Sequence, residues 1–207
     1  MPSTSSIIIQ HVIALRNAES ASVAYFYFNF RDVDKKHQHN LLSSLLIQLS
    51  SQSEDCFNTL SHVYSAYNEG KEQPSEDALT RSLKDMLKAL SLSQLPTYII
   101  LDALDECPNI SSIPTPGKHV LKLVTDLVDL HLPNLHIFVT SCPEVDICTA
   151  LEPLTLCHLS LHDQLGQKRD ISEYVNAMVQ SDTKMKRWRE DDRRLVIETL
   201  SEKADGM

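Results

Sequence analysis

The sequence predicts an α/β fold in which helices cover both faces of a mostly parallel sheet. Helix-like and strand-like segments alternate along the chain, which is typical of strands joined by helical crossovers. The strand-like segments are continuous apolar runs rather than alternating ones, as expected of strands buried on both faces. Runs of this kind predict four strands of one sheet, at Val23–Phe30, Thr97–Leu101, Leu135–Thr140 and Thr155–Leu161.

Apolar residues at helical spacing predict the helices between these strands. The spacing is clearest in a leucine-rich segment that begins at His39. Polar residues with Gly70 and Pro74 then mark a loop before a helix that Ser75 caps. The predicted helices of the main domain are Ser5–Leu15, His39–Ser51, Asp55–Tyr67, Ser75–Leu92 and Lys118–His131. A turn-rich loop is expected at Pro108–Gly117.

The last part of the chain differs in character and predicts a helical appendage. Arg169–Gln180 and Glu190–Glu202 have the pattern of amphipathic helices joined by a charged link. We therefore divide the chain into a main domain at residues 1–165 and an incomplete helical appendage at residues 166–207.

Composition and charge exclude several classes of function. A chain of 207 residues with 42% hydrophobic content can bury one sizeable core. Its formal net charge of -9 argues against nucleic acid as a partner, because phosphate-backbone binding depends on lysine and arginine. No stretch has the pattern of a signal peptide or the length of a membrane span. The five cysteines lack C-x-x-C spacing, so we expect reduced thiols in a cytoplasmic protein without membrane contacts.

The most informative segment runs from Tyr98 to Glu106 and reads Y-I-I-L-D-A-L-D-E. In an open α/β sheet, ligands bind at the carboxyl ends of the strands, where Asp102 is expected. Asp102 is the candidate Mg²⁺ ligand, because hard cations prefer oxygen ligands. Asp105 and Glu106 are the candidate catalytic acids, which hold or orient a water molecule. The alternative is structural, with Asp102 as a turn former at the strand end and the other two acids in a solvated loop.

This segment resembles the extended Walker B motif of the NACHT family, which is four apolar residues, Asp, a small residue, any residue and two acids. The resemblance extends to the aromatic run Val23–Phe30 and to the helix that reads L-L-S-S-L-L-I-Q-L-S from Leu41. It continues through the strand that leads into Ser141, Pro143 and Glu144, through D-I-S-E-Y-V at Asp170 and to K-A-D-G-M at the end. The resemblance therefore covers nearly the whole chain. The chain is similar to fungal NACHT proteins of the STAND class, which are related to the nephrocystin-type nucleotide-binding domain.

The resemblance implies a P-loop NTPase core with ATP and Mg²⁺ as cofactors. It also implies a nucleotide-driven switch in signal transduction, in which effector or repeat domains and self-association provide the protein partners. No nucleic acid or membrane is implied as a partner.

The phosphate-binding loop of that family is absent from this sequence. Such a loop has the form G-x-x-x-x-G-K-[ST], because glycines let backbone N–H groups approach the phosphates and the lysine neutralises their charge. The one Gly-Lys pair, Gly117-Lys118, is followed by His119 and has Ser112 where the earlier glycine should be. Met1 falls inside or just past the expected loop, so the first strand of the fold, the Walker A strand, is expected to be missing as well.

A missing first strand changes the expected sheet. In this class of P-loop folds that strand lies beside the sensor strand, which here is Leu135–Thr140, and its loss leaves unpaired N–H and C=O groups. Either Thr155–Leu161 moves in to pair with Leu135–Thr140, or a gap remains between them. A parallel strand formed by residues 1–9 in that position would contradict this interpretation.

The sensor position also departs from the family pattern. Relatives usually read T-S-R-P-E, with an arginine placed to sense the terminal phosphate, whereas this chain has Cys142 between Ser141 and Pro143. Cysteine has neither the fixed positive charge nor the forked donor set of arginine. We therefore expect ATP binding and hydrolysis to be lost or weak.

Three functions are compatible with these observations. The preferred interpretation is a degenerate or truncated NACHT NTPase module of a signalling switch protein, which acts through protein contacts. The alternative is a fragment of a working ATP-hydrolysing STAND switch whose phosphate-binding loop lies upstream of this sequence. A third, weaker interpretation is an unrelated metal-dependent hydrolase that uses Asp102, Asp105 and Glu106. Whether the chain is an enzyme stays open at this point.

Overall fold

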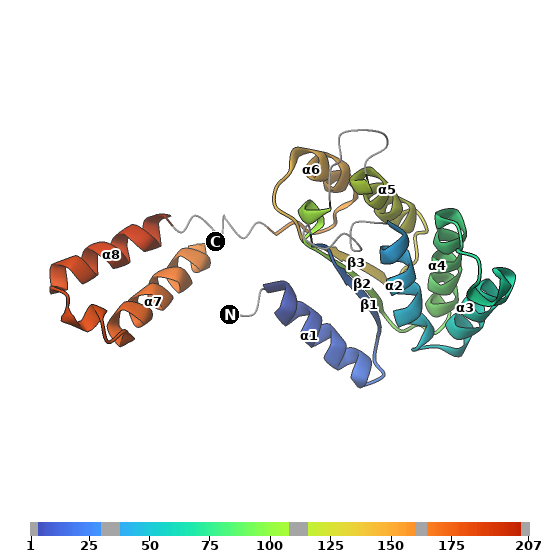
Figure 1. Ribbon diagram of the computed structural model, residues 1–207, viewed down its shortest axis with the longest axis horizontal. Helices are drawn as coiled ribbons and strands as arrows, with labels where there is room; N and C mark the ends of the chain where they lie inside the picture. The colour runs from blue at the N-terminus through green and yellow to red at the C-terminus, as the bar shows by residue number, and fades with distance from the viewer. Residues whose placement is uncertain (1–3, 30–37, 108–115, 160–164, 204–207) are drawn as a thin grey trace. The chain divides into compact units, whose positions relative to one another are not determined.

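Figure 1 shows the computed structural model of the chain, which describes residues 4–29, 38–107, 116–159 and 165–203. The chain divides into two compact units, residues 1–155 and 156–207, and each is described by itself. The strands and longer helices are α1 Thr4–Asn17, β1 Ser22–Tyr27, α2 Gln38–Ser50, α3 Glu54–Ala66, α4 Glu76–Ser91, β2 Thr97–Asp102, α5 Pro116–Val128, β3 Leu135–Val139, α6 Val145–Leu151, α7 Leu165–Ser181 and α8 Glu190–Lys203.

Three parallel strands form the sheet of the first unit, in the order β1-β2-β3. The register places Tyr27 of β1 opposite Asp102 of β2, and Leu101 of β2 opposite Val139 of β3. Parallel neighbours need a crossover connection, which α2 to α4 supply between β1 and β2, and α5 supplies between β2 and β3. The predicted α/β class is confirmed, and so is the parallel pairing of the first two predicted strands.

Helices cover both faces of this sheet, as predicted, but to different extents (Figure 1). On one face, Phe26 and Ile99 belong to the main core, which α2, α4 and α5 complete. The leucines of α2 that point into this core are fully buried, and burial of a side chain of this size contributes about 1.5–3 kcal/mol. On the other face, Ile9 and Val12 of α1 form a smaller cluster with residues of β1 and β2, including Ile100.

Two glutamines close the outer edge of β1. The main chain of Phe28 bonds to β2, so the alternate residues Val23 and Tyr25 direct their N–H and C=O groups away from the sheet. Gln52 accepts a hydrogen bond from the Val23 N–H at 2.9 Å and donates one to the Val23 carbonyl at 2.7 Å. Gln48 makes the same pair of bonds with Tyr25, at 3.1 and 2.8 Å. The two side-chain amides therefore take the place of a neighbouring strand.

At the opposite edge of the sheet, β2 is the one described strand that pairs with β3. The main-chain groups of Asn134 and Thr140 form hydrogen bonds with β2. The alternate residues Ile137 and Val139 therefore direct their N–H and C=O groups away from β2. Residues 4–9 belong to helix α1, so they do not form a parallel strand beside β3, which would have contradicted the sequence analysis. Within the described ranges, no second strand pairs with β3.

The predicted fourth strand at Thr155–Leu161 is wrong over its described residues. Glu152–Leu154 form a short 3-10 helix, and residues 155–159 contain no strand. Leu156 is 105% exposed and Leu159 is 62% exposed, so this run packs against no sheet. A short apolar run cannot be assigned to a strand from its composition alone, because it is buried only if a neighbouring strand is available. Its last two residues lie outside the described part of the chain.

Two helix assignments differ from the sequence analysis. Helix α6 was not predicted, and its Ile147 packs against the main core. Helix α5 begins at Pro116, within the predicted loop, and ends before His131, whose left-handed φ of 49° reverses the chain. Residues 108–115 of the predicted loop and Phe30 of the predicted first strand lie outside the described residues.

The second unit is a helical hairpin of α7 and α8, which contain the two helices predicted there. A short 3-10 helix at Met185–Arg187 joins them, and the Asp182 carboxylate accepts hydrogen bonds from the N–H groups of Lys184 and Met185, at 2.7 and 3.1 Å. Val179 is the one hydrophobic residue of this unit that is buried among those described. In the described ranges of the chain, no helix is long and apolar enough to cross a membrane.

The glutamines at the β1 edge generate a stability prediction. Gln48→Ala removes the partner of both outward main-chain groups of Tyr25, so we expect it to lower the free energy of unfolding by about 1–2 kcal/mol. Urea unfolding followed by circular dichroism measures this change. Ile47→Ala is the matched control, because Ile47 lies on the same helix turn and is 61% exposed. Equal losses in the two variants would contradict a role for Gln48 in closing the edge.

Candidate functional site

The predicted acids lie at the carboxyl end of β2, where the chain leaves the sheet through a tight turn. Asp102 is the last residue of β2, and Ala103 follows in the left-handed conformation with a φ of 56°. This conformation is unfavourable for a residue with a Cβ, by roughly 1–2 kcal/mol, and is tolerated when the surroundings hold it. Residues 104–106 then form a 3-10 turn, which Leu104 anchors in the core with 2% of its surface exposed.

Thr140 joins this turn to the end of β3. Its N–H donates to the Leu101 carbonyl at 3.0 Å, and its carbonyl accepts from the Leu104 N–H at 2.9 Å. Its hydroxyl donates to the Asp102 carboxylate and accepts from the Ala103 N–H, the latter at 3.0 Å. Every hydrogen-bonding group of Thr140 is thus used on β2 and the turn that follows it. These bonds hold Ala103 in its unfavourable conformation.

Asp105 makes a second connection between the same two chain segments. Its carboxylate accepts a hydrogen bond from the Cys142 N–H at 3.0 Å. Its interaction with the Cys142 thiol raises the pKa of that thiol, through a hydrogen bond first and through the negative charge second. A thiol with a raised pKa carries less of the nucleophilic thiolate at neutral pH. Cys142 is therefore a poor nucleophile, even though it is exposed.

The three candidate acids are half-buried but do not form a set of metal ligands by themselves. Among the described residues, no group of three or more His, Cys, Asp or Glu side chains is placed to hold a metal ion. Asp102 is engaged by Thr140, Asp105 is engaged by Cys142, and the Glu106 N–H donates to the Ala103 carbonyl at 2.9 Å. In the described ranges, no glycine-rich phosphate loop accompanies the acids, and the ATP and Mg²⁺ implied by the resemblance stay predictions.

Burial changes the pKa of other groups near the site. Burial, followed by the charges of Tyr25 and Asp102, raises the pKa of Tyr27, which faces Asp102 across the β1–β2 pair. Burial also raises the pKa of the Cys107 thiol to about 11. Both groups therefore stay neutral at physiological pH and add no charge to the end of the sheet.

The structure brings Asp102 and Asp105 together with two residues whose role sequence reasoning missed. The sequence indicated Thr140 only as the end of a predicted strand, and Ala103 only as the small residue of the acidic motif. A signal for Thr140 was present, because a hydroxyl residue at the end of the neighbouring parallel strand falls beside the acid at the end of β2. The roles of Asp102 as a metal ligand and of Asp105 and Glu106 as catalytic acids stay predictions.

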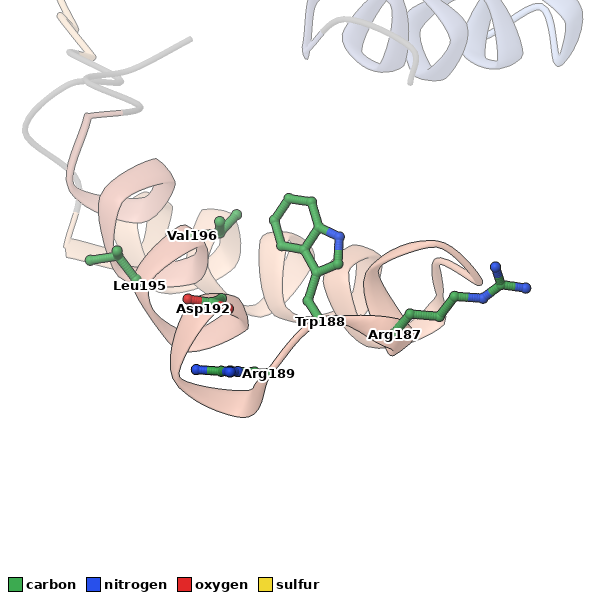
Figure 2. Close-up of a pocket in the computed structure, with 6 residues that line it drawn as sticks. All are labelled: Arg187, Trp188, Arg189, Asp192, Leu195 and Val196. Carbon is green, nitrogen blue, oxygen red and sulfur yellow. The ribbon is translucent and has the colours of Figure 1, made fainter.

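A separate surface hollow lies in the second unit, at the junction of α7 and α8. Figure 2 shows its lining residues, which are Arg187, Trp188, Arg189, Asp192, Leu195 and Val196. Trp188 is 47% exposed, and the Arg187 side chain points away from Trp188. The side chains of Arg187 and Arg189 point in different directions and do not converge on a common point in the hollow (Figure 2).

The hydroxyl of Thr140 generates a prediction for this site. Thr140→Val keeps the shape of the side chain but leaves the Ala103 N–H and the Asp102 carboxylate without their partner. We expect the free energy of unfolding to fall by about 1–3 kcal/mol. Thr140→Ser is the control, because serine retains the hydroxyl and loses only a methyl group. Chemical denaturation of both variants tests this, and a valine variant as stable as the serine variant would refute the role of the hydroxyl.

Comparison with known proteins places this arrangement in a family. The sequence model of the family described as Nephrocystin 3, N-terminal, matches residues 3–142, which include the sheet, the acids and Thr140. Neither a curated protein nor a solved structure matches the chain. Because the family match spans more than half of the sequence, the chain belongs to the Nephrocystin 3, N-terminal, family.

Proposed function

We propose that the chain is a NACHT-like module derived from a nucleotide-driven switch, and that it acts through protein contacts with weak or no ATP binding and turnover. Membership in the nephrocystin 3 family and the parallel sheet with an acid at the end of β2 support the NACHT-like part of this proposal. The hydrogen bonds that Asp102 and Asp105 accept from other parts of the chain support the proposed loss of ATP turnover.

The observation that carries the proposal is the use of both aspartates in protein contacts. The Thr140 hydroxyl donates to Asp102, and the Cys142 N–H donates to Asp105. A Mg²⁺ ion in a nucleotide site is held jointly by one or two carboxylates and by substrate phosphates. Metal binding here would have to compete with the Asp102–Thr140 bond and would lack the phosphate loop that holds the other ligands.

The sensor position supports the same conclusion. Cys142 occupies the place at which the family's T-S-R-P-E phrase has arginine, and its thiol stays neutral because Asp105 raises its pKa. An arginine that stabilises a transferring phosphoryl group can increase the rate by about 10³-fold or more. A neutral thiol offers no positive charge for this purpose.

The second candidate function is a working ATPase whose phosphate-binding loop comes from sequence upstream of this chain. It is favoured by the position of Asp102 at the carboxyl end of the central strand, where ligands bind in open α/β sheets. In that case, a chain extended to include a G-x-x-x-x-G-K-[ST] loop binds ATP·Mg²⁺, whereas the chain described here does not.

Nucleotide binding tests the proposed function directly. We expect isothermal titration with ATP·Mg²⁺ to show no binding in the micromolar range, and a phosphate-release assay to show no turnover. Asp102→Asn and Glu106→Gln should leave both results unchanged. Micromolar affinity for ATP·Mg²⁺, or turnover that either substitution abolishes, would contradict the proposal and would indicate a working ATPase.

A further inference from the structure

The junction between α7 and α8 carries the one tryptophan of the sequence on an exposed turn. Trp188 follows the short 3-10 helix Met185–Arg187, and 47% of its surface is exposed. Leu195 and Val196 of α8 line the same surface hollow, and Leu195 is 62% exposed (Figure 2). Within the described residues, Trp188 makes no contact with another ring. The junction therefore exposes a large aromatic ring beside an aliphatic side chain.

Basic residues surround this ring, although the chain as a whole is acidic. Residues 184–194 include six basic and three acidic residues, whereas the formal net charge of the chain is -9. Arg187 and Arg189, the two neighbours of the tryptophan, are exposed and form no ion pair in the part of the chain that the structure describes. Arg194, by contrast, pairs with Asp191 at 3.6 Å. The two arginines beside the tryptophan are therefore the available positive charges of the junction.

Hydrogen bonds fix the turn that presents these side chains. The Asp182 carboxylate accepts two main-chain N–H groups at the start of the turn, and the Trp188 N–H donates to the Met185 carbonyl at 3.0 Å. The Arg193 guanidinium donates to the Gln180 side chain at 3.3 Å and so connects α8 to α7. A side chain on an ordered turn loses less conformational freedom on binding than one on a mobile segment. The turn is thus prepared for contact with a partner.

We propose that a junction surface, formed by Arg187, Trp188, Arg189 and Leu195, binds a segment of a partner protein in which an apolar residue lies between acidic residues. The proposal rests on the proposed function, because it names the chemistry of one of the protein contacts through which the chain acts. Tryptophan and arginine are enriched among the residues that contribute most to binding at protein interfaces. The apolar residue of the partner packs on Trp188 and Leu195, and the flanking carboxylates bind the arginines.

The directions of the two arginines determine where the acids of the partner lie. Arg187 and Arg189 extend to different sides of Trp188 (Figure 2). A compact anion cannot bridge guanidinium groups that point apart, whereas acids on both sides of one apolar residue reach one arginine each. The planar guanidinium group also matches the geometry of a carboxylate, which it can bind with two parallel hydrogen bonds. The surface therefore favours the order acid, apolar residue, acid.

Acidic residues beside the junction surface favour a protein segment over a uniformly anionic partner. Glu190 and Asp191 begin α8 directly after Arg189 and are exposed, and Asp192 lines the hollow itself. A nucleic acid or an anionic membrane presents negative charge on all sides and would bring it against these acids, which is unfavourable. A protein segment can place its carboxylates opposite the arginines alone. The charge complementarity is therefore local, as in a protein interface.

Trp188 is the one tryptophan of the chain, so its fluorescence reports directly on the junction surface. The probe is a synthetic peptide in which two glutamates flank one leucine on each side, and the control peptide has glutamines in their place. We expect the acidic peptide to change the Trp188 emission of the full chain in a saturable way, and the control peptide to leave it unchanged. Added salt should weaken the binding, because exposed charges are screened. Emission that does not respond to millimolar acidic peptide would overturn the proposal.

Charge-reversal variants separate the proposed contacts from the overall charge of the chain. Arg187→Glu combined with Arg189→Glu should weaken binding of a labelled peptide, measured by fluorescence anisotropy, by about tenfold or more. Trp188→Ala should have an effect of similar size. Arg81→Glu combined with Lys88→Glu is the matched control, because both residues are exposed on α4 in the other unit and the net charge changes equally. Circular dichroism verifies that the variants are folded, and equal losses in the two double variants would contradict the proposal.

Two further results would assign the junction surface to another occupant and so overturn the proposal. One is a change in Trp188 emission with vesicles of equal parts phosphatidylcholine and phosphatidylserine but not with the peptide. The other is a change that depends on protein concentration alone, which would indicate a second copy of the chain. The proposed function is tested separately by ATP·Mg²⁺: turnover would contradict that function, whereas absent peptide binding without turnover would contradict the junction surface alone.

Discussion

The tie between β2 and β3 at Thr140 is the interaction on which the carboxyl end of the sheet depends. Parallel strands share no hairpin, so nothing in the local sequence holds their ends together. Thr140 supplies this connection with its N–H, its carbonyl and its hydroxyl. The left-handed Ala103, the seating of Leu104 in the core and the orientation of Asp102 all follow from it. The position of the candidate site is therefore set by a contact between strands rather than by the acidic motif alone.

This connection gives the acids a structural role, which fits the proposed loss of nucleotide turnover. In a nucleotide site of an open α/β sheet, an acid at the end of a strand serves a metal and its phosphates. In this chain, Asp102 and Asp105 accept hydrogen bonds from Thr140 and from the Cys142 main chain. Retaining the acids therefore preserves the end of the sheet even without ATP.

Sequence patterns predicted the parts of the fold that depend on local chemistry. The run from Thr97 to Leu101 was recognisable as a buried strand because its residues are apolar on both faces, and the stripe of α2 was recognisable from its leucine spacing. The same reasoning failed at Thr155–Leu161, which is equally apolar but has no neighbouring strand. Burial of a strand is a property of the assembled sheet and cannot be read from the run itself.

The connections made by side chains at long range could not be predicted from the sequence. Gln48 and Gln52 are ordinary polar residues near the end of a helix until the crossover brings that helix beside β1. Asp102 and Thr140 are 38 residues apart, and their contact depends on the register between two strands. The location of the acids at the strand end was predictable, but the partners of those acids were not.

Amide hydrogen exchange with and without ATP·Mg²⁺ tests the central claim most directly, because it reports the bonds made by Thr140 and Asp105. The account predicts slow exchange of the Ala103, Leu104 and Cys142 amides, at rates that ATP·Mg²⁺ does not change. Fast exchange of these amides in the free chain would show that the tie at the end of the sheet is not formed. Altered exchange on addition of ATP·Mg²⁺ would show that the acids still respond to nucleotide.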